Sequence, residues 1–295
     1  MDSAALKTYL AERAARIDRA LVEAMPAPTT FPERLHRAML YSLTAPGKRI
    51  RPILCLAAAA ASGGREEDAV APACAVEMIH AHSLIHDDLP CMDDDDLRRG
   101  LPTCHVRFGE VTALLAGDAL ISAAYAVLAR APLADETVRR LVAALAAAAG
   151  SEGICGGQEA DMAAEGTEAG LEAVETIHRY KTGSLLRAAV VMGGIAGGAA
   201  PSRLRALGDY GSRFGLAFQI RDDLLDVTGN REQLGKTPGK DASKSKPTYA
   251  SLLGAEGCRN ELDRLVGECA RVLEEFGTEA DPLRALARLL DAREP

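Results

Sequence analysis

Two clusters of aspartates, far apart in the chain, are the residues best suited to chemistry. The first cluster contains Asp87, Asp88 and Asp93, and the second contains Asp222, Asp223 and Asp226. Each follows an apolar stretch, where closely spaced carboxylates repel one another unless a cation neutralises them. Carboxylate oxygens suit hard divalent ions, above all Mg2+, which keeps several waters and is shared with substrate phosphates. The clusters therefore predict two facing aspartate walls that hold magnesium and a phosphorylated ligand.

The spacing within each cluster supports this prediction. Asp222 and Asp226 are four residues apart, so they lie on one face of a helix about one turn apart. Pro90 breaks the first helix, which lets the chain curl so that Asp93 returns toward Asp87. Both clusters are expected near helix C-termini, where the helix dipole disfavours negative charge and makes a metal ion more valuable. For the run Asp94–Asp96 a solvated acidic turn and a functional role both remain open.

Basic residues are gathered in short motifs where a diphosphate would need them. Gly47-Lys48-Arg49-Ile50-Arg51-Pro52 opens a predicted helix, whose N-terminal amides and dipole favour anions. Leu97-Arg98-Arg99-Gly100 follows the first aspartate cluster directly. Lys181-Thr182-Gly183, with Lys236 and Lys246 in a predicted loop, supplies positive charge near the second cluster. Any one of these motifs alone would be read as surface charge or a helix cap; their pairing with aspartates favours phosphate binding.

The elements that position these residues are predicted to be helices almost throughout. Alanine, leucine, arginine and glutamate dominate, aromatic residues make up only 4%, and long alternating β-branched runs are missing. The polar segment 228–247 reads as a loop, and 188–200, rich in glycine, as a buried helix packed through small residues. Helices are expected up to Pro26 and over residues 32–46, 48–61, 66–88, 111–130, 135–149, 171–191, 201–226, 257–276 and 282–291.

Composition narrows the class of protein further. A net charge of −8 and a pI near 5.4 argue against a nucleic-acid binder. Seven cysteines without a Cys-x-x-Cys pair, and no signal peptide before the charged first helix, predict reduced thiols and a cytoplasmic protein. The most apolar stretch is too short to span a membrane. No interdomain linker stands out, so residues 1–295 are expected to form a single domain.

At this point the motifs resemble those of a known family, the short-chain trans-isoprenyl diphosphate synthases. The segment from Ser83 to Asp93, with a two-residue Pro-Cys insertion between the aspartates, is similar to their first aspartate-rich motif, in the form found in bacterial farnesyl and plant-type geranylgeranyl diphosphate synthases. The resemblance covers nearly the whole chain in the right order. Its further motifs are Gly47-Lys48-Arg49-x-Arg51-Pro52, Leu97-Arg98-Arg99-Gly100, Gly156-Gly157-Gln158, Lys181-Thr182-Gly183, Phe218-Gln219-x-x-Asp222-Asp223-x-x-Asp226 and Gly235-Lys236.

The resemblance implies a fold, a cofactor and residue roles. The fold is the all-α isoprenoid synthase bundle around a central cavity, usually in a homodimer. The cofactor is Mg2+, three ions per site, for which Mn2+ can substitute. The metal ligands would be Asp87, Asp93 and Asp222, supported by Asp88 and Asp226, with Asp223 in the same catalytic motif. The allylic diphosphate would be held by Arg98, Lys181, Lys236 and Lys246. Isopentenyl diphosphate would be held by Lys48, Arg51, His80 and Arg99, with Arg49 in the same motif.

The implied reaction needs no nucleophilic side chain. The metal ions and cations would stabilise charge on the departing pyrophosphate, so that the allylic C–O bond ionises to a carbocation. The double bond of isopentenyl diphosphate then attacks, and a proton is lost to the released pyrophosphate. The carbonyls of Lys181 and Thr182 and the amide of Gln219 are candidates to stabilise the cation, while apolar helices exclude water.

Product length would be set by the floor of the cavity. His82 lies roughly 7 Å along its helix from Asp87, at about 1.5 Å rise per residue. In the resembling family an aromatic residue at this position limits the product to fifteen carbons, and a smaller one admits twenty. Histidine is intermediate, with Ser83 beside it and Met78 and Ile79 one turn further down. Farnesyl diphosphate is therefore the expected product and geranylgeranyl diphosphate the alternative; a purely structural role for His82 also remains open.

Three other functions fit parts of the pattern. His82, His86 and Asp87 on one helix are similar to the all-α metal phosphohydrolases, which would not need a second aspartate wall. A noncatalytic synthase-like subunit would be expected to lack one of the two motifs, and both are present. A terpene cyclase would share the metal logic but seldom shows a second diphosphate site such as the Lys48–Arg51 motif.

Overall fold

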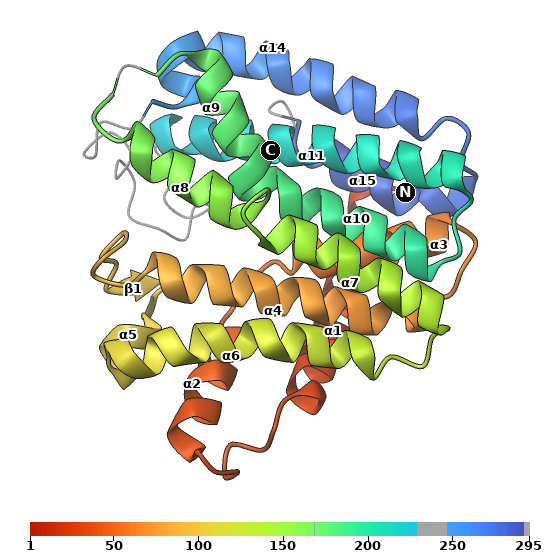
Figure 1. Cartoon of the computed structure of the whole chain (residues 1–295). Coiled ribbons are helices and arrows are strands. Elements are labelled where there is room, and N and C mark those ends of the chain that lie inside the picture. Colours follow the sequence, from red (N-terminus) through yellow and green to blue (C-terminus); the bar gives the residue numbers. More distant parts are fainter. Residues whose placement is uncertain (168, 229–246, 292–295) are drawn as a thin grey trace.

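The computed structural model describes residues 1–167, 169–228 and 247–291. These residues form a helical bundle, as predicted, to which one small hairpin is added (Figure 1). The first half contains α1 (Ser3–Ala24), α2 (Glu33–Leu43), α3 (Ile50–Ala61), η1 (Glu66–Ala69), α4 (Val70–Asp87), β1 (Leu97–Arg98), β2 (Leu101–Pro102), α5 (Cys104–Phe108), α6 (Glu110–Ala129) and α7 (Asp135–Ala149). The second half contains α8 (Ile154–Ala164), α9 (Leu171–His178), η2 (Arg179–Gly183), α10 (Ser184–Ala196), α11 (Pro201–Thr228), α14 (Tyr249–Val272), η3 (Thr278–Ala280) and α15 (Asp281–Arg288).

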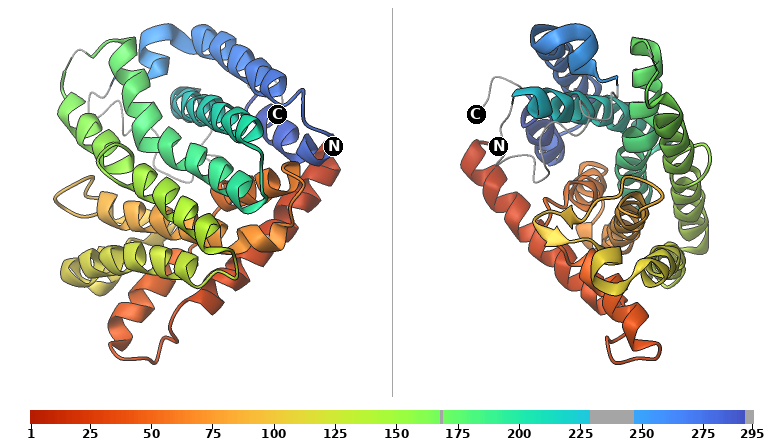
Figure 2. Two further views of the ribbon diagram at one scale, coloured as in Figure 1. Left: turned by 45° about the vertical axis from the view of Figure 1, so that its right-hand side comes forward. Right: turned by 90° about the vertical axis from the view of Figure 1, so that its left-hand side faces the viewer.

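The core is one contiguous cluster of buried apolar side chains that runs from Tyr9 to Leu290. Helix α4 packs along α6, and α10 contacts both α3 and α11, as the views in Figures 1 and 2 show. Small residues permit these contacts, as predicted for the glycine-rich part of α10. A Cβ atom on Gly193 would lie 2.0 Å from the backbone oxygen of Cys55 in α3. All seven cysteines are free thiols, and five of them are buried.

Several element boundaries differ from the predictions for identifiable reasons. Helix α3 begins at Ile50 rather than residue 48 because Arg49 adopts a left-handed conformation, with φ of 49°. The predicted helix 171–191 is interrupted by the π-helical turn η2 and continues to Ala196. Helix α14 begins at Tyr249 because Thr248 caps it, and the chain bends inside it at Gly254, with φ of 68°. Helix α8 and the hairpin β1–β2 were not predicted.

Helix α6 is the one described helix that is long and apolar enough to cross a membrane by length and composition, and 33% of that stretch is buried. It packs against α2 and α4 as a member of the bundle. Its exposed apolar side chains include Val111, Leu114 and Leu115. These three residues form a surface strip, called the α6 strip below.

Candidate active site

The first aspartate cluster lies where α4 ends and the chain turns back on itself. The Asp93 amide donates to the Asp87 carbonyl at 2.8 Å, and the Asp95 amide donates to the Asp88 carbonyl at 3.2 Å. Asp94 takes a left-handed conformation at φ of 50°, which completes the turn. The predicted return of Asp93 toward Asp87 is therefore confirmed.

The second cluster occupies the last turns of α11, and its middle member differs from the others in its role. The Asp223 carboxylate is buried and accepts hydrogen bonds from Gln219 Nε2 at 3.0 Å and from the Tyr249 amide at 2.9 Å. His178 Nε2 lies 3.7 Å from the same carboxylate. Asp223 thus joins α11 to the start of α14 and to α9. Asp222 and Asp226 are only partly buried on the same helix.

Each aspartate cluster has a basic side chain nearby. Helices α4 and α11 end on the same side of the molecule (Figure 1). Burial raises the pKa of Asp87, and nearby Lys181 on η2 opposes that shift. Burial lowers the pKa of the Arg51 guanidinium, while Glu77 on α4 and Asp222 on α11 both act to raise it. Arg51 therefore lies between the helices that carry the two aspartate clusters.

The donor set fits Mg2+ that is shared with a substrate. Its oxygens are all carboxylate, which suits a hard divalent ion. Among the described residues no three His, Cys, Asp or Glu side chains are gathered into a metal cage. A magnesium ion bound through one or two carboxylates, with waters and substrate phosphates completing its shell, needs no such cage. The residues that would hold it are Asp87 and Asp93 on one side and Asp222 and Asp226 on the other.

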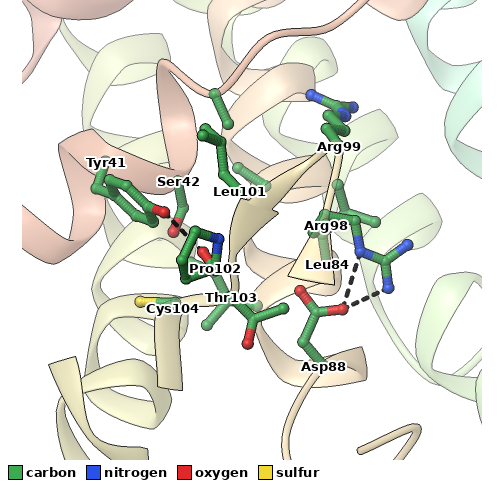
Figure 3. A pocket seen from close by; sticks show the side chains of 13 residues that line it. Tyr41, Ser42, Leu84, Asp88, Arg98, Arg99, Leu101, Pro102, Thr103 and Cys104 are labelled. Atoms are coloured by element: carbon green, nitrogen blue, oxygen red, sulfur yellow. Dashed lines mark hydrogen bonds and ion pairs between the residues drawn. The ribbon is translucent and has the colours of Figure 1, made fainter. Parts of the chain in front are cut away.

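Asp88 and Arg98 form an ion pair beside a narrow crevice between α2, α4 and the hairpin (Figure 3). Arg98 Nε donates to Asp88 Oδ1 at 2.9 Å, and Arg98 Nη2 reaches Asp95 Oδ2 at 3.4 Å. Both partners are largely buried, with side chains 12% and 5% exposed for Arg98 and Asp88. Asp88 therefore supports Arg98, and Asp95, left unassigned by the sequence, shares this contact.

The residues predicted for isopentenyl diphosphate converge at the start of α3. Arg51 Nη1 lies 3.3 Å from His80 Nε2. Burial, reinforced by Arg51, lowers the pKa of His80 well below its usual value, which favours the neutral ring. The Arg99 guanidinium lies over Gly47, where a Cβ atom would sit 2.4 Å from Arg99 Nη1. Lys48, next to Gly47, is exposed.

Arg49 is the exception in this motif. Its side chain is only 3% exposed and is ion-paired with Glu77 and Asp18, each at 2.7 Å. The sequence analysis grouped Arg49 with the substrate-binding residues, but its guanidinium is directed into the protein. Sequence reasoning missed Glu77, a buried acid in the apolar middle of α4.

The Lys181-Thr182 motif lies in the π-helical turn η2, a deviation often found at functional sites. Thr182 Oγ1 donates to Gln219 Oε1 at 2.9 Å, which links η2 to α11. Lys181 Nζ is 2.7 Å from Asp161 Oδ2 on α8, a partner that the sequence analysis did not identify. The glycine pair of α8 was a sequence signal for the close contact between α8 and η2. Gly157 lies one turn before Asp161, and a Cβ atom on it would lie 2.1 Å from the Lys181 amide nitrogen.

The four candidates for the cavity floor differ in exposure. Met78 and Ile79 are fully buried, His82 is 9% exposed, and Ser83 is partly buried. The His82 ring meets the His86 ring edge to face, with 4.5 Å between centroids. His86 Nε2 lies 3.1 Å from the Leu114 carbonyl, so this pair spans the seam between α4 and α6. Lys236 and Lys246, predicted to bind the allylic diphosphate, lie outside the described residues.

Comparisons with known proteins identify the family of this chain. A sequence model of the family described as polyprenyl synthetase matches residues 32–281. The chain is 44% identical to farnesyl diphosphate synthase of Bacillus subtilis (strain 168), with 98% of both chains covered. It is 46% identical to a chloroplastic geranylgeranyl pyrophosphate synthase of Catharanthus roseus, covering 98% of this chain and 81% of the relative.

Solved structures show the same relationship. An apo FPP/GFPP synthase from Zymomonas mobilis superposes with a TM-score of 0.88 at 38% identity, covering 99% of this chain and 100% of the other. A geranyltransferase from Helicobacter pylori, complexed with magnesium and isoprenyl diphosphate, gives a TM-score of 0.87 at 32% identity, with 98% of both chains covered.

Fold and site together define an all-α prenyltransferase of the trans-prenyl diphosphate synthase class. The chain belongs to the polyprenyl synthetase family. This result sets aside the metal phosphohydrolase suggested by His82, His86 and Asp87.

Proposed function

We propose that this enzyme condenses isopentenyl diphosphate with dimethylallyl diphosphate and then geranyl diphosphate to give (E,E)-farnesyl diphosphate. The observation that carries the product assignment concerns His82, which precedes Asp87 by five residues. Its ring is packed against the ring of His86. A braced aromatic ring at this depth narrows the space for a growing chain. Relatives named for fifteen- and twenty-carbon products are about equally similar, so geranylgeranyl diphosphate is the alternative product.

Two groups of cations support two diphosphate sites. Lys48, Arg51 and Arg99, with neutral His80, would bind isopentenyl diphosphate, since they gather at the start of α3. Lys181 and Arg98 would bind the allylic diphosphate. Both are paired with carboxylates, Lys181 with Asp161 and Arg98 with Asp88. Those carboxylates fix the direction of each cation.

Mg2+ bound at the aspartate walls would neutralise charge on the leaving diphosphate. We propose three ions per site, with Mn2+ able to substitute. The chain contributes Asp87 and Asp93 from the turn after α4, and Asp222 and Asp226 from the end of α11. Asp223 positions this wall through the Tyr249 amide and Gln219, and is a positioning residue.

Backbone and side-chain groups at η2 would then stabilise the allylic cation. The carbonyl groups of Lys181 and Thr182 belong to the π-helical turn η2, and their negative ends would face the positive carbon. Gln219 is fixed at both ends, by Thr182 and by Asp223, so its amide needs no reorganisation during the reaction. The buried apolar helices exclude water that would quench the cation.

The α6 strip supports a homodimer. Val111 is 73% exposed, and Leu114 and Leu115 are 47% and 50% exposed, on an otherwise apolar helix. A second copy of the chain that covered this strip would remove apolar surface from water.

The decisive experiment is product analysis. Purified protein is incubated with Mg2+, isopentenyl diphosphate and, separately, dimethylallyl, geranyl or farnesyl diphosphate, and product lengths are measured by chromatography. Accumulation of fifteen-carbon product, with little conversion of the farnesyl primer, supports the proposal. Dominant twenty-carbon product would replace it with the alternative.

A further inference from the structure

The Arg49 guanidinium is a meeting point of four segments of the chain. Its Nε donates to Asp18 Oδ1 of α1 at 2.7 Å, and its Nη1 donates to Glu77 Oε1 of α4 at 2.7 Å. Its Nη2 donates to the backbone oxygens of Leu43, at the end of α2, and Ala45, at 3.0 and 3.1 Å. All three nitrogens of the fork are thus used on acceptors that lie inside the protein.

The backbone at Arg49 is held in a conformation that this residue would not choose alone. Its φ of 49° is left-handed, a conformation that is unfavourable for a residue with a Cβ. Such a conformation persists where surrounding contacts determine it. The consequence is visible in burial, because the Arg49 side chain is buried while that of its neighbour Lys48 is exposed. The contacts of Arg49 therefore determine the position of Lys48.

Arg49 and Arg51 both reach α4, one helical turn apart. Arg49 meets Glu77, and Arg51 meets His80 three residues further on, at 3.3 Å. The Glu77–Arg49 pair consequently sets the register between the start of α3 and the part of α4 that carries His80. The Arg99 guanidinium lies over Gly47, in the loop that precedes α3. A shift of this loop would therefore alter the spacing of the four residues proposed to bind isopentenyl diphosphate, which are Lys48, Arg51, His80 and Arg99.

Stability alone is a weak explanation for the Arg49–Glu77 pair. Both side chains are almost fully buried, at 3% and 4% exposure. The desolvation cost of such a pair can exceed its Coulombic gain, and a well-packed apolar pair is often equally stable. What an apolar pair cannot supply is the donor fork that ties Leu43 and Ala45 to the loop.

We infer that Arg49, anchored by Glu77 and Asp18, is a positioning residue that holds Lys48 and Arg51 at the spacing required by the diphosphate of isopentenyl diphosphate. This inference rests on the proposed assignment of Lys48 and Arg51 to that substrate. Arg49 itself does not touch the diphosphate.

The main test is Glu77→Gln, which keeps the shape of the side chain and one acceptor oxygen but removes the charge that fixes Arg49. Steady-state kinetics are measured with each substrate varied. The expected result is a rise of roughly tenfold in KM for isopentenyl diphosphate, with kcat and the allylic KM changed by less than about threefold. An unchanged KM for isopentenyl diphosphate, or equal losses for both substrates, would overturn the inference.

Two further variants grade the effect. Asp18→Asn keeps an acceptor on the exposed side of Arg49 and should raise the same KM by only about twofold. Glu12→Gln is the matched control, because Glu12 is another exposed acid on α1 that pairs with a different arginine, Arg13. It should leave all constants unchanged. An effect of Glu12→Gln equal to that of Glu77→Gln would also overturn the inference.

A double variant separates folding from positioning. Arg49→Met with Glu77→Met removes both buried charges and should be more thermally stable than Arg49→Met alone, where Glu77 is left buried without its partner. Its KM for isopentenyl diphosphate should nevertheless stay raised. Recovery of that KM together with stability would show that Arg49 serves the fold only.

One arm tests the underlying assignment. Lys48→Ala should raise the KM for isopentenyl diphosphate more than Glu77→Gln does. If Lys48→Ala leaves this KM unchanged, the proposed substrate site is wrong. If Lys48→Ala raises it and Glu77→Gln does not, the site stands and the positioning role of Arg49 is overturned.

Discussion

Lys181 and Asp161 form an ion pair across two helical segments, with 2.7 Å between Nζ and Oδ2. The ammonium comes from the π-helical turn η2 and the carboxylate from α8. Lys181 also stabilises the ionised form of Asp87, which burial disfavours. Lys181 thus interacts with a carboxylate on α8 and with the first aspartate cluster. The ion pair with Asp161 fixes the position of the Lys181 ammonium.

The first prediction concerns Asp161. Asp161→Asn should lower kcat/KM for the allylic diphosphate by about tenfold, since Lys181 loses the charge that fixes its position. The KM for isopentenyl diphosphate should stay within about twofold of its starting value. Lys181→Ala should impair the same substrate more strongly. Glu159→Gln, an exposed acid on the same helix, is the control; if it matched Asp161→Asn, the specific role of the pair would be refuted.

A second prediction concerns the aspartate walls. Asp87→Asn or Asp222→Asn should lower turnover by at least about a hundredfold, as for loss of a charge-stabilising element, while circular dichroism shows an intact fold. Asp209→Asn, an exposed aspartate earlier on α11, should have no effect. Near-normal turnover in either wall variant would show that the metal is bound elsewhere.

Metal removal gives a third prediction. A chelator should abolish turnover, and added Mg2+ should restore it. Asp226→Asn, which removes one carboxylate from the second wall, should raise the Mg2+ concentration needed for half-maximal activity severalfold. An unaltered Mg2+ titration in this variant would exclude Asp226 from metal binding. Substitution by Mn2+ can be measured in the same assay.

Sequence reasoning succeeded where chemistry is local. Helical periodicity and proline positions located most helices, and Pro90 predicted the turn that returns Asp93 to Asp87. The spacing of Asp222 and Asp226 placed them on one helical face. These features depend on a few neighbouring residues, so a single sequence contains enough information to predict them.

The features that were missed depend on contacts between distant segments. Arg49 belongs to a basic motif, yet its guanidinium is buried in ion pairs with Glu77 and Asp18, while Lys48 remains exposed. Asp223 belongs to an aspartate motif, yet its carboxylate accepts a hydrogen bond from the Tyr249 amide of another helix. Motif membership alone does not separate a residue that binds substrate from one that holds its neighbour. The distinction requires the residue's contacts in the folded protein, such as Glu77 for Arg49 and the Tyr249 amide for Asp223.

A fourth prediction concerns pH. Burial, reinforced by His86, lowers the pKa of His82 to about 4. In the unfolded chain a histidine titrates near 6.5, so between these values the unfolded state binds more protons and folding stability falls as pH decreases. His82 would contribute up to about 3 kcal/mol to this loss. Thermal melts from pH 7 to pH 4 should therefore show a shallower dependence in His82→Asn than in the wild type; parallel curves would contradict it.

The last prediction concerns product length. His82 is braced by His86, which in turn is seated against Gly117 of α6, where a Cβ atom would lie 2.2 Å from His86 Nε2. The proposed floor would therefore be a contact across the α4–α6 seam, in which the position of His82 depends on His86.

His82→Ala removes the ring itself and should shift the products from fifteen toward twenty carbons, because the growing chain gains depth beside Ser83. His86→Ala should produce a smaller shift in the same direction, since His82 then loses its edge-to-face support and can turn into the vacated space. Met78→Ala, in a fully buried side chain one turn further down, is the comparison. Chromatography of the products decides between them. If only Met78→Ala lengthened the products, the floor would lie one turn deeper than His82.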